Sequence, residues 1–138
     1  AALVTPVRVH VGGTARERFM DGGLLGQRAV WTRRAVELLA AAKAAREAGM
    51  VPTTLLRMGS ALTIANSVIF DAGNGFAGCI PGIHEVLRAQ GLMRGVWCLN
   101  PGETLSPGQR QAIARLRIGP PELTDADYVR ERLDRWLS

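Results

Sequence analysis

A change of pattern at Pro52 constrains the fold of this chain more than any other feature of its sequence. Before Pro52, glycines separate short β-branched segments from segments rich in alanine and arginine. After it, prolines stand near the start of several helical segments, where their fixed φ suits a first helical turn. The chain is therefore expected to consist of an α/β part, residues 1–50, and a C-terminal helical part, residues 51–138.

Residues 7–48 are predicted to alternate strands and helices. Residues 7–11 alternate apolar and polar side chains, which is typical of a short strand. A helix is expected over 15–21, where glycines follow, and a second strand over 27–32. The alanine- and leucine-rich segment 33–49 predicts a strong helix. The order strand, helix, strand, helix is typical of parallel α/β units.

Four helices are predicted beyond Pro52, and they span residues 52–70, 81–90, 107–116 and 125–137. Thr124 or Asp125 can cap the last of them. Asp71 and Asn74 border a glycine-rich turn, and they are expected to cap helix ends.

The composition indicates one globular domain. The 138 residues can bury a core of their own, and 47% hydrophobic with 21% charged residues is ordinary for a folded protein. The 17 basic residues are arginines except for Lys43, and they exceed 12 acidic ones. The arginines are spread among acidic residues, without a reader motif or an aromatic platform. We therefore expect no nucleic-acid partner.

Cys79 and Cys98 are expected to be buried free thiols, because no neighbouring Cys or His completes zinc-ligand spacing. No metal site is predicted, and the glycine spacing predicts no nucleotide site. The apolar runs are shorter than a membrane span, and the first residues lack the pattern of a signal peptide. The expected location is cytoplasmic, with no membrane partner.

Two segments carry a resemblance to a known family. Residues 73–92 read GNGFAGCIPGIHEVLRAQGL, in which an Ile-Pro pair opens a helix that ends in a Gly-Leu pair. Residues 105–113, LSPGQRQAI, follow with a proline at the start of another helix. Together they resemble the C-terminal helical region of dihydrodipicolinate synthase-like proteins in the N-acetylneuraminate lyase superfamily. Residues 7–26 are similar to the family's seventh strand, its following helix and the step into its eighth strand.

The resemblance implies a (β/α)8 TIM barrel of about 250 residues. This chain would hold its last two strands and the C-terminal helices, so it would be dominated by helices. The family is one of lyases and aldolases. Its members act on carbon–carbon bonds of 2-oxo acids, or dehydrate sugar acids, through a lysine Schiff base without a further cofactor. The Schiff-base lysine stands on the sixth strand and the catalytic tyrosine on the fifth, and neither strand is expected among these residues.

Lys43, the single lysine, is a poor match for that nucleophile. A nucleophilic lysine must be desolvated or lie near another cation, and on a barrel it points inward from a strand end. Lys43 instead falls in the middle of the helix predicted over 33–49, three residues before Arg46. We expect it on a solvated helix face. Tyr128, the single tyrosine, lies beyond the region of similarity, so no catalytic residue is predicted in this chain.

Four residues are predicted to bind substrate within an intact barrel. Gly12, Gly13 and Thr14 follow the first strand, where the family lines its pocket with a glycine, although they could equally form only a strand–helix turn. Arg28 aligns with a pocket-lining position. There it could clamp a substrate carboxylate, or it could lie on the surface if the register differs by one residue. Trp31 and Thr32 would end the same strand.

Two histidines are expected to be structural. His10 alternates with valines on the first strand and therefore faces the opposite side of the sheet, and His84 lies beside Glu85 in the helix of the resemblance.

Two classes of function stay open. The first is the C-terminal portion of a dihydrodipicolinate synthase-like lyase, inactive as this isolated chain. It would act with a small 2-oxo acid in the full-length parent, and as a homo-oligomer or with a missing N-terminal half. The second is a stand-alone helical interaction or regulatory module without catalysis. A truncated barrel would expose the open edge of its first strand and apolar helix faces, which would need a partner.

Overall fold

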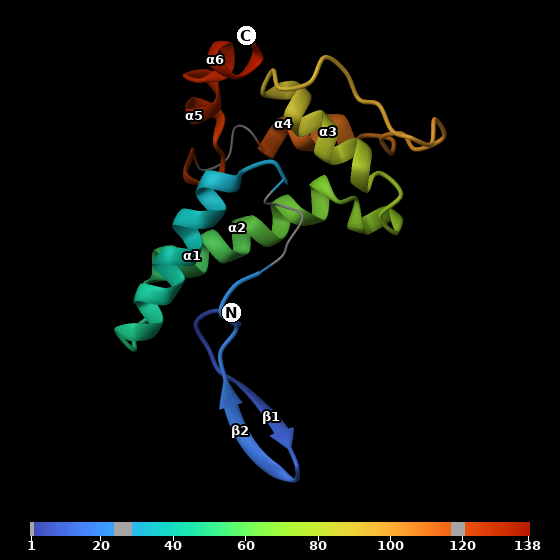
Figure 1. Ribbon diagram of the computed structural model, residues 1–138. Coiled ribbons are helices and arrows are strands. Elements are labelled where there is room, and N and C mark those ends of the chain that lie inside the picture. The colour runs from blue at the N-terminus through green and yellow to red at the C-terminus, as the bar shows by residue number, and fades with distance from the viewer. Residues whose placement is uncertain (1, 24–28, 117–120) are drawn as a thin grey trace.

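A computed structural model describes residues 2–23, 29–116 and 121–138 (Figure 1). Helices dominate it, and a two-stranded antiparallel sheet precedes them. The mixed α/β class and the excess of helix are as predicted. The described residues form a hairpin attached to a helical body, and the parallel α/β units expected over residues 7–48 are not present there.

The sheet is a hairpin of β1 (Val7–Val11) and β2 (Thr14–Arg18). The prediction of the first strand is confirmed, whereas the prediction of a helix over 15–21 is wrong. Gly12 and Gly13 both have positive φ, 56° and 79°, which makes them a two-residue type I′ turn. That turn returns the chain directly against β1, with Val11 opposite Thr14. Strand pairing thus outweighs the helix preference of the Ala-Arg-Glu segment.

The first two helices agree with the sequence. α1 (Thr32–Glu47) and α2 (Thr53–Ile69) match the predictions over 33–49 and 52–70. The second strand expected over 27–32 is wrong for its described part, because residues 29–31 form a turn and Thr32 already begins α1. Residues 24–28 lie outside the described part of the chain.

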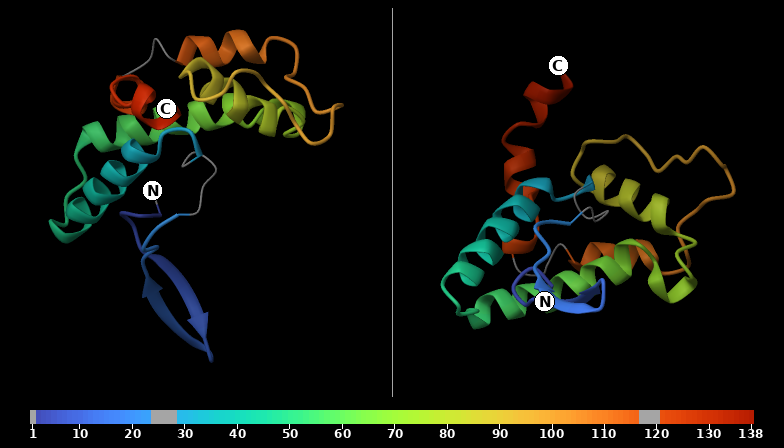
Figure 2. Two further views of the ribbon diagram at one scale, coloured as in Figure 1. Left: turned by 45° about the horizontal axis from the view of Figure 1, so that its top comes forward. Right: turned by 60° about the horizontal axis from the view of Figure 1, so that its bottom comes forward.

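The remaining elements are the 3-10 turn η2 (Ala72–Asn74), α3 (Cys79–Ala89), α4 (Gln109–Leu116), the 3-10 turn η3 (Pro121–Leu123), α5 (Ala126–Arg130) and α6 (Leu133–Leu137). Of these, η2, α3 and α4 lie near the C-terminal end of α2, whereas α5 and α6 lie beyond the start of α1 (Figures 1 and 2). The prediction of a single helix over 125–137 is wrong. The backbone leaves the helix at Arg132, whose φ is −120° and whose guanidinium stacks on the Tyr128 ring at 4.0 Å.

The core lies where α2, α3 and α4 meet. Ala65 and Ile69 of α2 are fully buried there, and Trp31, 2% exposed, enters from the turn before α1. The other buried members of this cluster are Val30, Val86, Ile113 and Leu123. The chain before α1 therefore contributes to the core through two residues that the sequence had assigned to a strand.

None of the helices in the described part of the chain is long and apolar enough to cross a membrane.

Candidate functional site

The residues predicted to bind substrate lie at the tip of the hairpin. Gly12, Gly13 and Thr14 are exposed, and a Cβ added to either glycine would meet no other atom within 4 Å. Thr14 begins β2 and does not cap a helix. The apolar hollow between α1, α2 and the 3-10 turn η3 is not lined by these residues. Arg28 lies outside the described residues.

The lysine and the tyrosine take no part in a common site. Lys43 is exposed on α1, as predicted. Tyr128 lies on α5, where Arg33 and Arg132 approach its ring at 4.8 and 4.0 Å. The tyrosine therefore serves as a stacking surface between two guanidinium groups.

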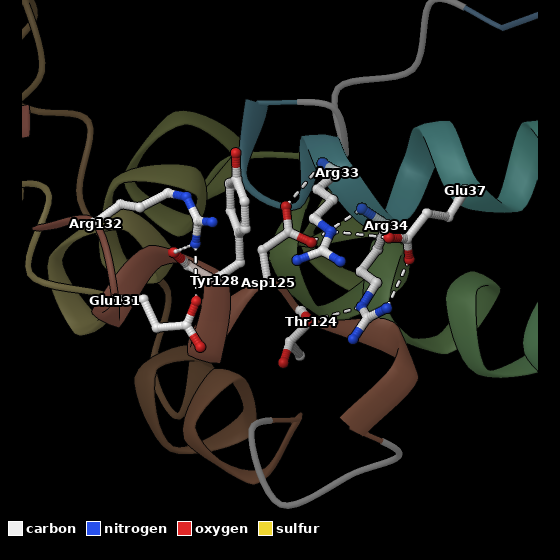
Figure 3. Close-up of polar contacts among 8 residues, drawn as sticks. All are labelled: Arg33, Arg34, Glu37, Thr124, Asp125, Tyr128, Glu131 and Arg132. Atoms are coloured by element: carbon white, nitrogen blue, oxygen red, sulfur yellow. Dashed lines mark hydrogen bonds and ion pairs between the residues drawn. The ribbon is translucent and has the colours of Figure 1, made fainter.

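Asp125 joins the C-terminal segment to the start of α1 (Figure 3). Its carboxylate oxygens accept hydrogen bonds from the backbone N–H groups of Arg33, at 2.8 Å, and Arg34, at 2.9 Å. These N–H groups lie in the first turn of α1, which has no side-chain cap of its own. A buried carboxylate at a helix N-terminus also interacts favourably with the helix dipole. Asp125 thus caps α1 and not, as predicted, its own helix.

A cluster of charged side chains surrounds this cap (Figure 3). Glu37 accepts hydrogen bonds from the Arg33 Nε at 2.8 Å and from an Arg34 Nη at 2.6 Å. The hydrogen bonds from Arg34 and Arg33 hold the pKa of Glu37 below its ordinary value. Arg34 also donates to the carbonyl oxygen of Thr124 at 3.3 Å. Arg34 is therefore engaged in internal contacts, which leaves it poorly placed to clamp a ligand.

An apolar hollow of about 290 Å³ adjoins the charged cluster, between α1, α2 and η3. The charged residues that line this hollow are Arg34, Glu37 and Glu122. The rest of its lining comes from Leu38, Ala41, Pro52, Thr54, Leu55, Met58 and Leu123. The described residues of the lining include no Ser, Cys, His or Lys, so the hollow could receive apolar groups, and no base lies beside its one hydroxyl, that of Thr54, to activate it except carboxylates.

A second polar cluster lies at the junction of α2, α3 and α4. The side-chain amide of Gln109 donates to the carbonyl oxygens of Ile69, at 3.2 Å, and Gly78, at 3.0 Å. It also lies 3.3 Å from the carbonyl oxygen of Val68. Ile69 and Val68 belong to the last turn of α2, whose carbonyl groups lack partners within the helix. A side chain from α4 therefore caps α2.

Asp71 caps α3 in the same cluster. Its carboxylate accepts hydrogen bonds from the backbone N–H of Gly78, at 2.9 Å, from the Ser106 hydroxyl and from the Asn74 amide. Burial acts to raise the pKa of Asp71, but these three hydrogen bonds outweigh it and hold the pKa below its ordinary value. The predicted capping role is confirmed for Asp71, whereas Asn74 supports the Asp71 carboxylate.

The glycines of the second cluster leave no room for a side chain. A Cβ on Gly82 would lie 2.0 Å from the Ile69 carbonyl oxygen, and a Cβ on Gly78 would lie 2.1 Å from the Gln109 Oε1. Real Cβ atoms do not approach other atoms so closely. The obstacle at Gly82 is backbone, so only glycine fits there, whereas a Cβ at Gly78 would displace the side chains of Gln109 and Asp71.

Glu85 ties α3 to α4 beside this cluster. It is buried, and both its oxygens accept hydrogen bonds from Arg88, at 2.7 and 2.8 Å. Arg110 of α4 lies 3.4 Å from the same carboxylate. The hydrogen bonds from Arg88 hold the pKa of Glu85 below its ordinary value, against the effect of burial. The arrangement is a structural ion-pair network.

The two cysteines are free thiols, as predicted, but both are half-buried and not buried. The Cys98 Sγ lies 3.9 Å from the His84 Nδ1, which agrees with a packing role for that histidine. Burial and nearby carboxylates, Asp71 for Cys79 and Glu103 for Cys98, raise the pKa values of both thiols. A raised pKa lowers the fraction of thiolate, the nucleophilic form, at both cysteines. His10 is exposed on β1.

The residues that organise the fold were largely missed from sequence. Gln109 contacts Ile69 across 40 positions, and Asp125 contacts Arg33 across 92. The only local signal for the Asp125 cap was the absence of a capping side chain at Trp31. No group of three or more His, Cys, Asp or Glu side chains in the described part of the chain is arranged to hold a metal ion.

Comparison with known proteins returned no relative. No family model matches the chain, and neither a curated protein nor a solved structure does.

Proposed function

We propose that this chain is the C-terminal portion of a dihydrodipicolinate synthase-like lyase of the N-acetylneuraminate lyase superfamily. Its helices would serve there as scaffold, and the Schiff-base lysine would come from residues outside 1–138. The observation that supports this proposal is the contact of Gln109 with Gly78. It joins the two segments, 73–92 and 105–113, on which the resemblance rests.

The sequence motifs of these segments have structural causes in this fold. Gly78 and Gly82 are the positions where α3 meets Gln109 and the end of α2 without space for a Cβ. Pro81 lies in the first turn of α3, where its missing N–H costs no intrahelical hydrogen bond. Ser106 and Gln109 form one half of a capping box, because the Gln109 Oε1 accepts from the Ser106 N–H at 3.1 Å. A shared helical junction would require these same residues in any related protein.

Within a complete barrel, β1 would be the seventh strand, and residues 1–50 would form the last two β/α units. In that barrel β1 would pair in parallel with a neighbouring strand, so the antiparallel hairpin of β1 and β2 would have to open. The pocket role of Gly12, Gly13, Thr14 and Arg28 depends on that rearrangement. The helical junction around Gln109 does not depend on it.

Trapping with borohydride tests the catalytic part of the proposal. The isolated chain is incubated with pyruvate and sodium borohydride and then analysed by mass spectrometry. We expect no adduct on Lys43, because this lysine is exposed on a helix and is not desolvated as a nucleophilic lysine must be. A stoichiometric adduct on Lys43 would overturn the assignment. In a longer polypeptide that contains the barrel strands, pyruvate should instead be trapped on a lysine outside residues 1–138, and Lys43→Ala should not reduce trapping.

A second candidate function is a non-catalytic helical interaction module. The apolar hollow between α1 and α2 and the exposed hairpin favour it. Thermal unfolding of residues 1–138 followed by circular dichroism separates the two candidates. A cooperative transition of the isolated chain supports the module. A transition that appears only when the barrel strands are co-expressed supports the scaffold.

A further inference from the structure

The hairpin is the least supported part of the described structure. Figures 1 and 2 show it projecting from the helices, with the Gly12–Gly13 turn at its far end. Val7 and Val11 are 37% and 61% exposed, and every residue of β2 is exposed. An isolated two-stranded hairpin is only marginally stable in water, whereas three or more strands with an apolar face are stable. Its unpaired edges can also accept another strand.

The register divides the side chains of the hairpin between two faces. Val7, Val9 and Val11 point to one face, because side chains alternate along a strand. The residues opposite them on β2 are Arg18, Arg16 and Thr14. The other face carries Arg8, His10, Ala15 and Glu17. One face of β1 is therefore a row of valines. No second layer of the described residues packs on this face.

Among the described residues β1 pairs with β2 alone, so its other backbone edge is free. A two-residue type I′ turn is closed by a hydrogen-bonded pair, here Val11 and Thr14. Hydrogen-bonded and non-hydrogen-bonded pairs alternate along an antiparallel ladder. Val9 thus directs its backbone groups toward β2, and Arg8 and His10 direct theirs away from it. The N–H and C=O groups of these two residues form the outer edge.

For the closed hairpin of residues 7–18, and not for the opened form that a complete barrel requires, we propose that a second copy of this chain pairs with this edge, with β1 antiparallel to β1 of the partner about a twofold axis at Val9. Arg8 then stands opposite His10 of the second copy, so the two residues can exchange backbone hydrogen bonds. Val9 faces its own counterpart in a non-hydrogen-bonded pair, where side chains lie closest. Val7 faces Val11 of the other copy. The result is a four-stranded antiparallel sheet with a continuous face of valines, three from each chain.

The charges favour the β1 edge over the β2 edge. The same twofold pairing through β2 would place Arg16 directly opposite Arg16 of the second copy, and like charges in that position are destabilising. Through β1, no identical charges face each other. Arg8 also has Glu17 as a neighbour within its own hairpin, at 3.9 Å. Valine stands at the first, third and fifth positions of β1, so the positions of the valines are the same in both directions of pairing.

The position of the hairpin leaves space for this partner. Figure 1 shows the helices beyond the end of the hairpin that is opposite to its turn. In the proposed antiparallel arrangement the two helical bodies would therefore lie at opposite ends of the sheet. The turn consists of glycines whose surroundings are open. The pairing requires no change in the helices.

Light scattering on the full chain after size exclusion, over a series of concentrations, tests the proposal. We expect a dimer whose dissociation constant rises at least about tenfold in Val9→Lys, because two ammonium groups would then meet at the twofold axis. The matched control is Val36→Lys, which changes an exposed valine of α1 and should leave dimerisation unchanged. Arg16→Ala should also leave it unchanged, because β2 is not at the interface. A monomeric wild type, or a Val9→Lys variant that dimerises as tightly as wild type, would overturn the proposal.

Cross-linking and hydrogen exchange give readouts that do not depend on the stability of a charged variant. With Cys79 and Cys98 replaced by serine, Val9→Cys should form a disulfide-linked dimer under oxidised glutathione. Paired Cα atoms at such a position lie about 4.5 Å apart, within the range of disulfides. The Arg8 and His10 amides should become protected as concentration rises. If Val9→Cys cross-links no faster than Val36→Cys, or if these amides exchange freely at all concentrations, the edge is not a dimer interface.

Discussion

The side-chain amide of Gln109 lies 3.0 Å from the carbonyl oxygen of Gly78, and a Cβ at residue 78 would displace this amide. Through its hydrogen bonds to Ile69 and Gly78, this side chain of α4 links the start of α3 to the end of α2. The carbonyl group of Ile69, in the last turn of α2, has no partner within that helix, so the hydrogen bond from Gln109 lowers the cost of burying it.

Replacement of Gln109 by alanine should destabilise the fold by about 2 to 4 kcal/mol, because it leaves the carbonyl group of Ile69 without its partner and opens a cavity. Urea unfolding followed by circular dichroism measures this change. Gln111→Ala on the same helix is the control, since Gln111 is exposed and should have little effect. Equal effects of the two substitutions would contradict the role of Gln109.

Two glycine-to-alanine substitutions should change stability in opposite directions. Gly82→Ala places a Cβ 2.0 Å from the Ile69 carbonyl oxygen and should destabilise by about 2 kcal/mol or more. Gly59 lies on the exposed side of α2 with open space around it, so Gly59→Ala should stabilise by about 0.5 to 1 kcal/mol. Midpoints of thermal unfolding compare the two, and a destabilised Gly59→Ala would show that this face of α2 is covered.

Removal of the Asp125 carboxylate should loosen α1. Asp125→Ala leaves the Arg33 and Arg34 N–H groups without their partner and should cost about 1 to 2 kcal/mol, the usual effect of losing a cap. Hydrogen exchange should rise first in the opening turn of α1. Asp127→Ala removes a carboxylate from an exposed ion pair on α5 and is the control, with an expected cost below about 0.5 kcal/mol. Unchanged exchange at Arg33 and Arg34 in Asp125→Ala would argue against the cap.

Local patterns predicted the long helices because those patterns depend on neighbours in sequence. α1 and α2 begin and end within a few residues of their expected bounds. The hairpin was missed for a specific reason. Gly12-Gly13 is a strong turn signal, but the Ala-Arg-Glu segment after it has a helical preference, and the pairing of β2 with β1 outweighed that preference.

The polar junctions could not be predicted, because they join residues far apart in sequence. Asp125 looked like the cap of the helix that follows it, and only the approach of α1 in space gives its carboxylate a better partner. Trp31 was placed at the end of a strand, yet it is buried in the core between helices. Its apolar character was evident from sequence, whereas its secondary structure depended on tertiary packing.

Acid should destabilise the fold through Asp71 and Glu85, whose pKa values lie below the ordinary 3.8 and 4.5 in the folded state. A carboxylate with a depressed pKa stabilises the folded state fully above its ordinary value, and this contribution is lost as pH falls below it. The urea midpoint should therefore be nearly constant above about pH 5 and fall steeply below pH 4.5.

Asp71→Asn keeps a residue that tolerates the positive φ of 57° at this position, and it should make the acid dependence shallower. Glu17→Gln, on the exposed strand β2, is the control and should retain the wild-type slope. An acid dependence in Asp71→Asn and Glu85→Gln as steep as that of wild type would show that these carboxylates do not govern acid stability.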